Sequence, residues 1–98
     1  MLRRFEGATV VVSGAAKGIG EGIAERFAQE GANVVITDLL EQVKDTAARL
    51  GETYKVKAEG VKLDVTNEEQ VVAFYEKIGK DYGRLDVSVQ NAGIITIK

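Results

Sequence analysis

The sequence contains no cysteine, no histidine, no proline and no tryptophan among its 98 residues. Without cysteine it can form neither a disulfide nor a thiolate metal site, and without histidine it has no imidazole for metal binding or proton transfer. We therefore expect no metal site. The formal net charge is −2, so no excess of basic residues is available to neutralise nucleic-acid phosphates, and we expect no nucleic-acid partner.

Long apolar runs are also absent. No stretch approaches the roughly 20 apolar residues that a membrane-spanning helix needs, so we expect no membrane partner. The first apolar run follows two arginines, as in a signal peptide, but Thr9, Ser13 and Gly14 interrupt it. We expect a cytoplasmic protein with a single domain over residues 1–98.

Short apolar runs alternate regularly with amphipathic patterns along the chain. A continuous apolar run is typical of a strand covered on both faces, and apolar residues three or four apart are typical of a helix. Strands are predicted over residues 8–13, 33–38, 60–64 and 86–90, and helices over residues 18–30, 40–50 and about 67–82. This alternation favours an α/β fold, a parallel four-stranded sheet with helices on both faces. Right-handed crossovers favour the strand order 3-2-1-4.

Local patterns set the expected boundaries of the helices. The first helix is expected to bury an apolar stripe that begins at Ile19, and Gly51 is expected to end the second helix. Residues 52–59 are charged and poorly patterned, which indicates a loop. Thr66 and Glu69 fit a capping box at the start of the third helix.

Residues 13–20, Ser-Gly-Ala-Ala-Lys-Gly-Ile-Gly, join the first predicted strand to the first predicted helix. The start of a helix exposes backbone N–H groups and carries a partial positive charge, so it attracts anions. Glycine at positions 14, 18 and 20 lets a phosphate approach the main chain with no Cβ in the way. The spacing differs from the general dinucleotide fingerprint and from a P-loop, and a plain connecting loop is the alternative for the glycines alone.

Four polar or glycine positions fall at the ends of the four predicted strands. These positions are Gly14, Asp38, Asp64 and Asn91. In a sheet of order 3-2-1-4 the strand order reverses between strands one and four, and ligands bind outside the carboxyl ends of strands at such a point. Asp38 stands about 20 residues after the glycines, where an acid can accept hydrogen bonds from a ribose 2′-OH. Capping of the second helix is the alternative role for this acid.

Taken together, residues 13–20, Asp38, Asp64-Val65 and Asn91-Ala92-Gly93 resemble the short-chain dehydrogenase/reductase family. The resemblance covers essentially the whole chain and corresponds to the first half of such an enzyme, a half-Rossmann β-α-β-α-β-α-β unit. It implies a nicotinamide dinucleotide as the cofactor. The residues that it implies for cofactor binding are Gly14, Lys17, Gly18, Ile19, Gly20, Asp38, Leu39, Asp64, Val65, Asn91, Ala92 and Gly93.

The resemblance also suggests individual roles. Asp64 and Val65 would contact the adenine, although Asp64 could instead favour the start of the third helix through its dipole. Residues 91–93 would let the cofactor ribose lie against bare backbone, or else form an ordinary loop. Family members have a second asparagine before this Asn-Ala-Gly, where this chain has Gln90, so any contact of that side chain within the sheet is in doubt.

The expected cofactor is NAD rather than NADP. The carboxylate of Asp38 would repel a 2′-phosphate on the ribose. Lys17 favours the opposite choice, because enzymes resembling this chain often carry a basic residue there when they use the phosphorylated cofactor. A lysine that is merely solvated is the alternative, and the acid is expected to lie nearer the discriminating atom.

The fourth predicted strand alternates apolar and polar residues, Val87-Ser88-Val89-Gln90. A strand buried on both faces reads as a continuous apolar run, so one face of this strand is expected to be wet. The strand would also be a bare edge, which is a template for pairing with another chain. We therefore expect self-association through this edge or the uncovered sheet face, as a homodimer.

The resemblance implies a catalytic Ser and a Tyr-x-x-x-Lys pair beyond the Asn-Ala-Gly segment, and this chain has neither there. The residues four positions after Tyr54, Tyr75 and Tyr82 are Ala58, Gly79 and Asp86. We therefore expect no catalytic residues and no dehydrogenase activity from these 98 residues alone. Three functions remain open: an NAD-binding module, an oxidoreductase half that is active only when complemented, and an engineered or ancestor-like folded scaffold without useful ligand binding.

Overall fold

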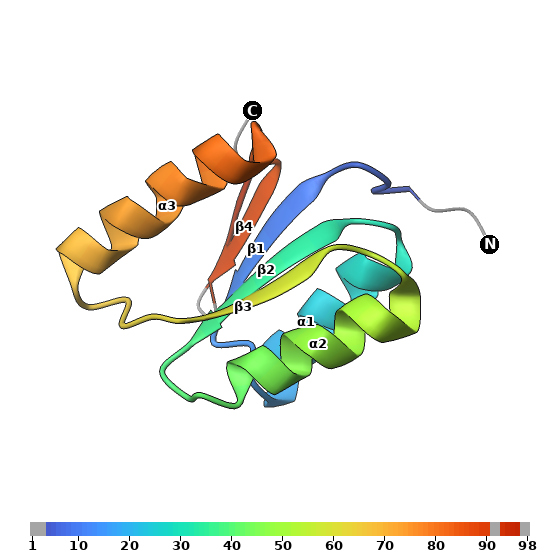
Figure 1. Ribbon diagram of the computed structural model, residues 1–98, viewed down its shortest axis with the longest axis horizontal. Helices are drawn as coiled ribbons and strands as arrows, with labels where there is room; N and C mark the ends of the chain where they lie inside the picture. The colour runs from blue at the N-terminus through green and yellow to red at the C-terminus, as the bar shows by residue number, and fades with distance from the viewer. Residues whose placement is uncertain (1–3, 91–92, 97–98) are drawn as a thin grey trace.

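The computed structural model describes residues 4–90 and 93–96 and forms one sheet with three helices around it (Figure 1). Within this part of the chain the sheet has five strands in the order β3-β2-β1-β4-β5. The elements are β1 (Thr9–Ser13), α1 (Gly18–Gln29), β2 (Asn33–Asp38), α2 (Val43–Tyr54), β3 (Ala58–Lys62), α3 (Glu68–Tyr82), β4 (Val87–Gln90) and β5 (Gly93–Thr96).

The first four strands are parallel and have the predicted order 3-2-1-4. Helices α1 and α2 lie on one face of the sheet and α3 lies on the other, as Figure 1 shows. The predicted half-Rossmann arrangement is therefore confirmed. None of the described helices is long and apolar enough to cross a bilayer.

The core has one layer on each face of the sheet. Alternate residues of β1 and β2 point to opposite faces, so the continuous apolar runs of these strands serve both layers. The layer against α1 and α2 contains Val12 and Ile36, packed with small helical side chains such as Ala24. The layer against α3 contains Val11 and Phe74.

Helix α2 starts and ends later than predicted, and strand β3 starts and ends earlier. The helix runs from Val43 to Tyr54 rather than over 40–50, and the strand covers Ala58–Lys62 rather than 60–64. Residues 52–59, expected to be a loop, therefore contain the end of one element and the start of the next. Gly51 does not end the helix. A Cβ at this glycine would lie 3.3 Å from the Cβ of Ala58, so the glycine lets the helix pack closely on β3.

The predicted capping box is wrong by one residue. Asn67, not Thr66, is the N-cap of α3, and its side-chain oxygen accepts a hydrogen bond from the backbone N–H of Gln70 at 3.1 Å. Thr66 instead donates its hydroxyl hydrogen to Asp64 at 2.6 Å. Asparagine is among the strongest N-cap residues, and here it takes the position next to the threonine.

Strand β5 was not predicted, and it pairs antiparallel with β4. The expectation that β4 is a bare edge is therefore wrong, because within the described residues the sheet edges are β3 and β5. The expectation of a wet face on β4 is also wrong at Ser88, which is buried and whose hydroxyl lies 2.9 Å from the hydroxyl of Tyr75 on α3. Self-association of the chain stays a prediction.

Candidate functional site

The loop between β1 and α1 makes two sharp left-handed turns. Gly14 follows directly after β1 with φ of 66°, and Gly18 opens α1 with φ of 68°. Glycine adopts this region readily because it has no Cβ to clash with the following carbonyl. The two glycines therefore let the backbone leave a buried strand and enter a helix within a few residues.

Gly20 has a different role in the same loop. It is buried in the first turn of α1, and a Cβ built on it would overlap the carbonyl oxygen of Gly14. The helix therefore starts in direct contact with the turn that precedes it. Any side chain at this position would push the turn and the helix apart.

Three hydrogen bonds from other elements hold the loop in place. The backbone N–H of Ala15 donates to the carbonyl of Thr37 at 3.1 Å, and that of Ala16 donates to Asp38 Oδ2 at 3.0 Å. The hydroxyl of Thr46 on α2 donates to the carbonyl of Ala16 at 2.8 Å in a buried environment. The loop is thus fixed by hydrogen bonds to β2 and to α2.

The N-terminus of α1 has no side-chain cap. Lys17 is the N-cap, its backbone is extended, and its side chain makes no capping hydrogen bond. The acid of the first turn, Glu21, is paired with Arg49 of α2 at 2.7 Å. The backbone N–H groups of the first turn are therefore not capped by Lys17, and the helix dipole favours an anion at this point.

Both carboxylate oxygens of Asp38 already accept a backbone hydrogen bond. Oδ2 accepts from Ala16 and Oδ1 accepts from Leu40 at 3.1 Å. Each carboxylate oxygen has a second lone pair, so the group can also accept from a ligand hydroxyl. The alternative role as a cap of α2 is wrong, because the N-cap of that helix is Gln42.

Asp64 shapes the turn between β3 and α3. Its Oδ1 accepts from both the backbone N–H and the hydroxyl of Thr66, at 2.9 and 2.6 Å. The hydroxyl bond, followed by the backbone bond, holds the pKa of Asp64 below its usual value. The backbone N–H of Asp64 donates to the side chain of Gln70 at 3.2 Å, a contact that sequence reasoning missed. The carboxylate is thus held in place in this turn, and Asp64 does not line the cleft that opens at the carboxyl ends of the strands.

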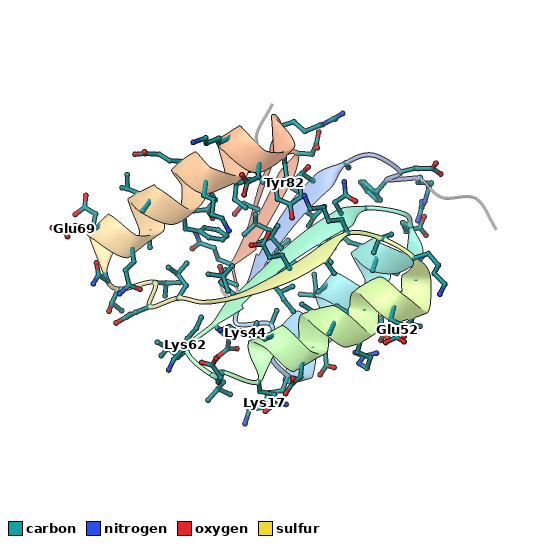
Figure 2. All side chains as sticks on the ribbon, in the orientation of Figure 1. Lys17, Lys44, Glu52, Lys62, Glu69 and Tyr82 are labelled. Atoms are coloured by element: carbon teal, nitrogen blue, oxygen red, sulfur yellow. The ribbon has the colours of Figure 1, made fainter. Side chains whose placement is uncertain are left out.

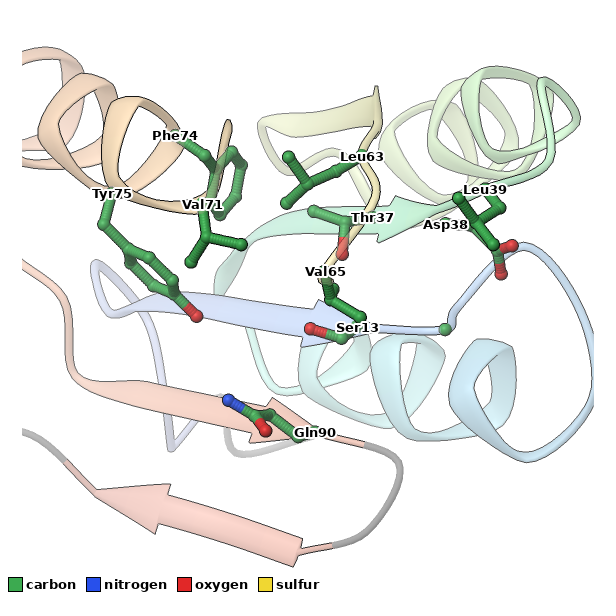
Figure 3. Close-up of a pocket in the computed structure, with 11 residues that line it drawn as sticks. Ser13, Thr37, Asp38, Leu39, Leu63, Val65, Val71, Phe74, Tyr75 and Gln90 are labelled. Carbon is green, nitrogen blue, oxygen red and sulfur yellow. The ribbon is translucent and has the colours of Figure 1, made fainter. Parts of the chain in front are cut away.

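A cleft of about 430 Å³ opens at the carboxyl ends of the strands, on the α3 side of the sheet (Figure 3). It brings together four of the predicted site residues, Gly14, Asp38, Leu39 and Val65. The other lining residues are Ser13, Thr37, Leu63, Val71, Phe74, Tyr75 and Gln90. Such a cleft, apolar with a few polar groups, is the usual form of a small-molecule site.

Three predicted site residues are exposed apolar side chains. The exposed fractions are 78% for Ile19, 61% for Leu39 and 58% for Val65. Ile19 was also expected to start the buried stripe of the first helix, and that expectation is wrong. In Figure 3 Leu39 lies beside Asp38, and Val65 lies next to Ser13. Exposed apolar groups around a cleft are typical of ligand contacts.

The remaining predicted site residues lie away from the cleft or outside the description. Lys17 and Gly18 belong to the loop but do not line the cleft. Gly93 is the first residue of β5 and pairs with Gln90. Asn91 and Ala92 lie outside the described residues.

Sequence reasoning missed the α3 wall and two threonines. Thr46 lies among the buried positions of α2, and a polar residue on that apolar face is the signal that could have identified it. Thr37 is completely buried in the floor of the cleft, and its hydroxyl has no hydrogen-bond partner within the described part of the chain. Its place before Asp38 at the end of β2 gave no separate signal.

Comparisons with known proteins agree with this fold. A family model described as enoyl-(acyl carrier protein) reductase matches residues 14–97. The crystal structure of a short chain dehydrogenase from Mycobacterium smegmatis superposes with a TM-score of 0.84 and 38% sequence identity, covering 91% of this chain and 38% of that one. The chain belongs to the short-chain dehydrogenase/reductase family. 

Other relatives in this family are similar over nearly the whole chain. The 3-oxoacyl-[acyl-carrier-protein] reductase of Thermotoga maritima is 40% identical over 91 residues, which cover 93% of this chain and 37% of the relative. The 3β-hydroxysteroid dehydrogenase of Mediterraneibacter gnavus is 39% identical, with 97% and 34% covered. The chain therefore spans about a third of the length of these curated relatives.

One similar structure contains a cofactor. It is the L-sorbose reductase of Gluconobacter frateurii, complexed with NADPH and L-sorbose, with a TM-score of 0.86 and 35% identity, covering 95% of this chain and 36% of that one. A nicotinamide dinucleotide is thus bound by a protein of the same family and fold.

Proposed function

We propose that this chain binds a nicotinamide dinucleotide by its ADP portion, in the manner of the cofactor-binding half of a dehydrogenase. The pyrophosphate lies at the glycine turns and the start of α1, where the N-cap side chain leaves the first-turn N–H groups uncapped. The adenosine ribose hydrogen-bonds to Asp38. The base lies between Leu39 and Val65, whose exposed apolar side chains would then be covered.

The observation that carries this proposal is the contact between the loop and Asp38. The N–H of Ala16 binds Oδ2 of Asp38 at 3.0 Å, so the anion site and the carboxylate are joined directly. A ligand that offers both a diphosphate and an adjacent ribose satisfies both groups at once. The remaining contacts implied by the family resemblance are the backbone of residues 91–93 and the side chain of Asp64.

The proposed cofactor is NAD in preference to NADP. The negative charge of Asp38 repels a phosphate on the ribose 2′ oxygen, whereas a 2′-hydroxyl donates to it. We propose an affinity of roughly tens of micromolar or weaker, because the 98 residues leave the nicotinamide end of the cofactor largely in water.

The variant Asp38→Asn tests this assignment. Asparagine keeps an oxygen that can accept from Ala16, but it loses the charge and one acceptor. NAD affinity is expected to fall about tenfold or more, and the NAD-to-NADP preference is expected to move toward unity. The matched control is Asp81→Asn on α3, away from the cleft. An unchanged preference in Asp38→Asn would remove the ribose assignment.

We further propose that the 98 residues do not transfer hydride by themselves. The oxidoreductase relatives are about three times longer than the matched region, and the catalytic Ser, Tyr and Lys implied by the resemblance fall beyond residue 93. Oxidation of NADH should not exceed the protein-free rate with the chain alone. A separately produced C-terminal part of a related enzyme can be added to the chain. If activity then appears, the result supports the alternative of an oxidoreductase half that is active only when complemented.

A further inference from the structure

Three lysines belong to segments that lie next to the end of β2, where Asp38 stands. Lys62 is the direct cross-strand partner of Asp38, because β2 and β3 are in register at this pair. Lys17 follows Ala16, whose N–H binds the carboxylate. Lys44 stands in the first turn of α2, and Figure 2 shows the three lysines at the same end of the structure.

Close packing fixes Lys44 beside strand β3. A Cβ built on Gly60 would lie 2.8 Å from the Cα of Lys44, so the start of α2 rests on the strand two residues before Lys62. The two lysines therefore approach the end of β2 from neighbouring elements. This placement depends on the backbone and not on flexible side chains alone.

Glu41 pairs with both of these lysines. Its Oε1 lies 2.9 Å from the ammonium of Lys44, and its Oε2 lies 3.8 Å from that of Lys62. The ammonium of Lys44, chiefly through its hydrogen bond, lowers the pKa of Glu41 and keeps the carboxylate charged. Each carboxylate oxygen thus faces a different cation.

We propose that Glu41 is a second determinant of cofactor choice, because it holds Lys44 and Lys62 away from a phosphate on the ribose 2′ oxygen. This inference rests on the proposed function, in which the ribose lies at Asp38. It adds a phosphomonoester site, formed by Lys44 and Lys62, that is occupied by the chain's own carboxylate.

Charge balance explains the direction of the effect. The three lysines would attract a 2′-phosphate on a ribose bound at Asp38, and the carboxylates of Asp38 and Glu41 would repel it. Glu41 both adds a negative charge and binds two of the cations. Its ion pairs are exposed to solvent, with 65% of its own side chain accessible, and exposed pairs are weak and sensitive to salt. Removing this charge therefore releases both lysines without disturbing the core.

The test measures dissociation constants of NAD and NADP for Glu41→Gln and for the control Glu52→Gln. Glu52 is an exposed acid near the other end of α2 (Figure 2). In low salt, Glu41→Gln is expected to tighten NADP binding about fivefold and to change NAD binding less than about twofold. The gain should shrink as the ionic strength rises, and Glu52→Gln should change neither ligand.

The substitution Lys62→Gln tests where the gain in NADP affinity comes from. The gain could come from the release of Lys62 or only from the loss of the negative charge of Glu41. In the parent chain this substitution is expected to change NADP affinity little, because Lys62 is engaged by Glu41. In the Glu41→Gln background it should remove most of the fivefold gain. Effects of the two substitutions that simply add would overturn the inference.

These measurements also distinguish failure of this inference from failure of the proposed dinucleotide binding. NAD binding to the parent chain with an unchanged NAD-to-NADP ratio in Glu41→Gln overturns the inference and leaves the proposed function standing. Failure of the parent chain to bind either dinucleotide overturns both. Amide spectra of the variants that match the parent chain verify that Glu41→Gln, an exposed substitution, has left the fold intact.

Discussion

The hydroxyl of Thr46 donates a hydrogen bond of 2.8 Å to the carbonyl of Ala16, although the two residues are 30 positions apart in the sequence. Both residues are buried. The contact joins helix α2 to the loop that precedes helix α1. The shape of the candidate anion site is thus set partly by a helix that does not belong to the glycine motif.

Replacement of this threonine tests the contact. Thr46→Val keeps the shape of the side chain but leaves the buried carbonyl of Ala16 without its donor, which costs about 1–3 kcal/mol. The free energy of unfolding, measured by urea denaturation, is expected to fall by this amount. Thr46→Ser retains a hydroxyl and should lose clearly less. Equal losses in both variants would show that packing of the methyl group, and not the hydrogen bond, stabilises the loop.

Replacement of threonine by valine should have the opposite effect on the free energy of unfolding at Thr37. Its hydroxyl is buried without a partner in the described part of the chain, and burial of an unpaired hydroxyl is unfavourable. Thr37→Val is therefore expected to leave the free energy of unfolding unchanged or to raise it by about 1 kcal/mol. Urea denaturation of this variant beside Thr46→Val makes the comparison direct. A loss as large as that of Thr46→Val would contradict the account.

Two glycines of α1 offer a matched pair of substitutions. A Cβ on Gly20 overlaps the carbonyl of Gly14, whereas a Cβ on Gly22 meets nothing within 4 Å. Gly20→Ala is expected to lower the free energy of unfolding by about 1–3 kcal/mol and to weaken dinucleotide binding. Gly22→Ala is expected to raise stability by about 0.5–1 kcal/mol, since alanine is the better helix former. Thermal unfolding followed by circular dichroism measures both, and stabilisation by Gly20→Ala would contradict the close approach.

The contacts of Glu59 on β3 make part of the protein's free energy of unfolding depend on pH, and this part should be lost in acid. Its carboxylate binds the ammonium of Lys77 at 2.8 Å and the hydroxyl of Tyr82 at 3.2 Å. The hydrogen bond from Lys77 is the main cause that lowers the pKa of Glu59. The ammonium of Lys57, which lies over the ring of Tyr82, lowers it further.

A carboxyl whose pKa is lower in the folded state stabilises that state above its unfolded pKa, about 4.3 for glutamate. The contribution is lost as the pH falls through the folded pKa. Glu59→Gln should therefore destabilise the protein at pH 7 and cost progressively less below about pH 4. Unfolding free energies of the parent chain, Glu59→Gln and the exposed control Glu52→Gln between pH 3 and pH 7 measure this. A cost for Glu59→Gln that does not change with pH would contradict the ion-pair account.

The sequence predicted the topology because the alternation of elements and the handedness of crossovers leave few arrangements. It also predicted that Gly14 follows the first strand and that Asp38 ends the second, as the structure shows. The boundaries of α2 and β3 were missed because Gly51 and Gly60 act through helix-to-sheet packing, which no local pattern records. Strand β5 was missed because an antiparallel return depends on pairing with β4.

The site was predicted less completely than the fold. Backbone-shaping residues such as Gly14 carry a local signal. Thr46 reaches the glycine loop, and Phe74 of α3 reaches the cleft, only through tertiary packing. The carboxylate of Asp38 was expected to accept hydrogen bonds from a ribose. In the structure it already accepts hydrogen bonds from two backbone N–H groups. That double role appears only when the loop and the end of β2 are seen together.

The central claim is that the glycine loop and Asp38 together bind a dinucleotide. Titration of the isotopically labelled chain with NAD, followed by amide NMR, tests it most directly. We predict saturable shifts at the amides of Gly14, Ala16, Gly18 and Leu40, with those of the outer face of α3 unmoved. Silence at these amides in millimolar NAD, or shifts confined to α3, would contradict it.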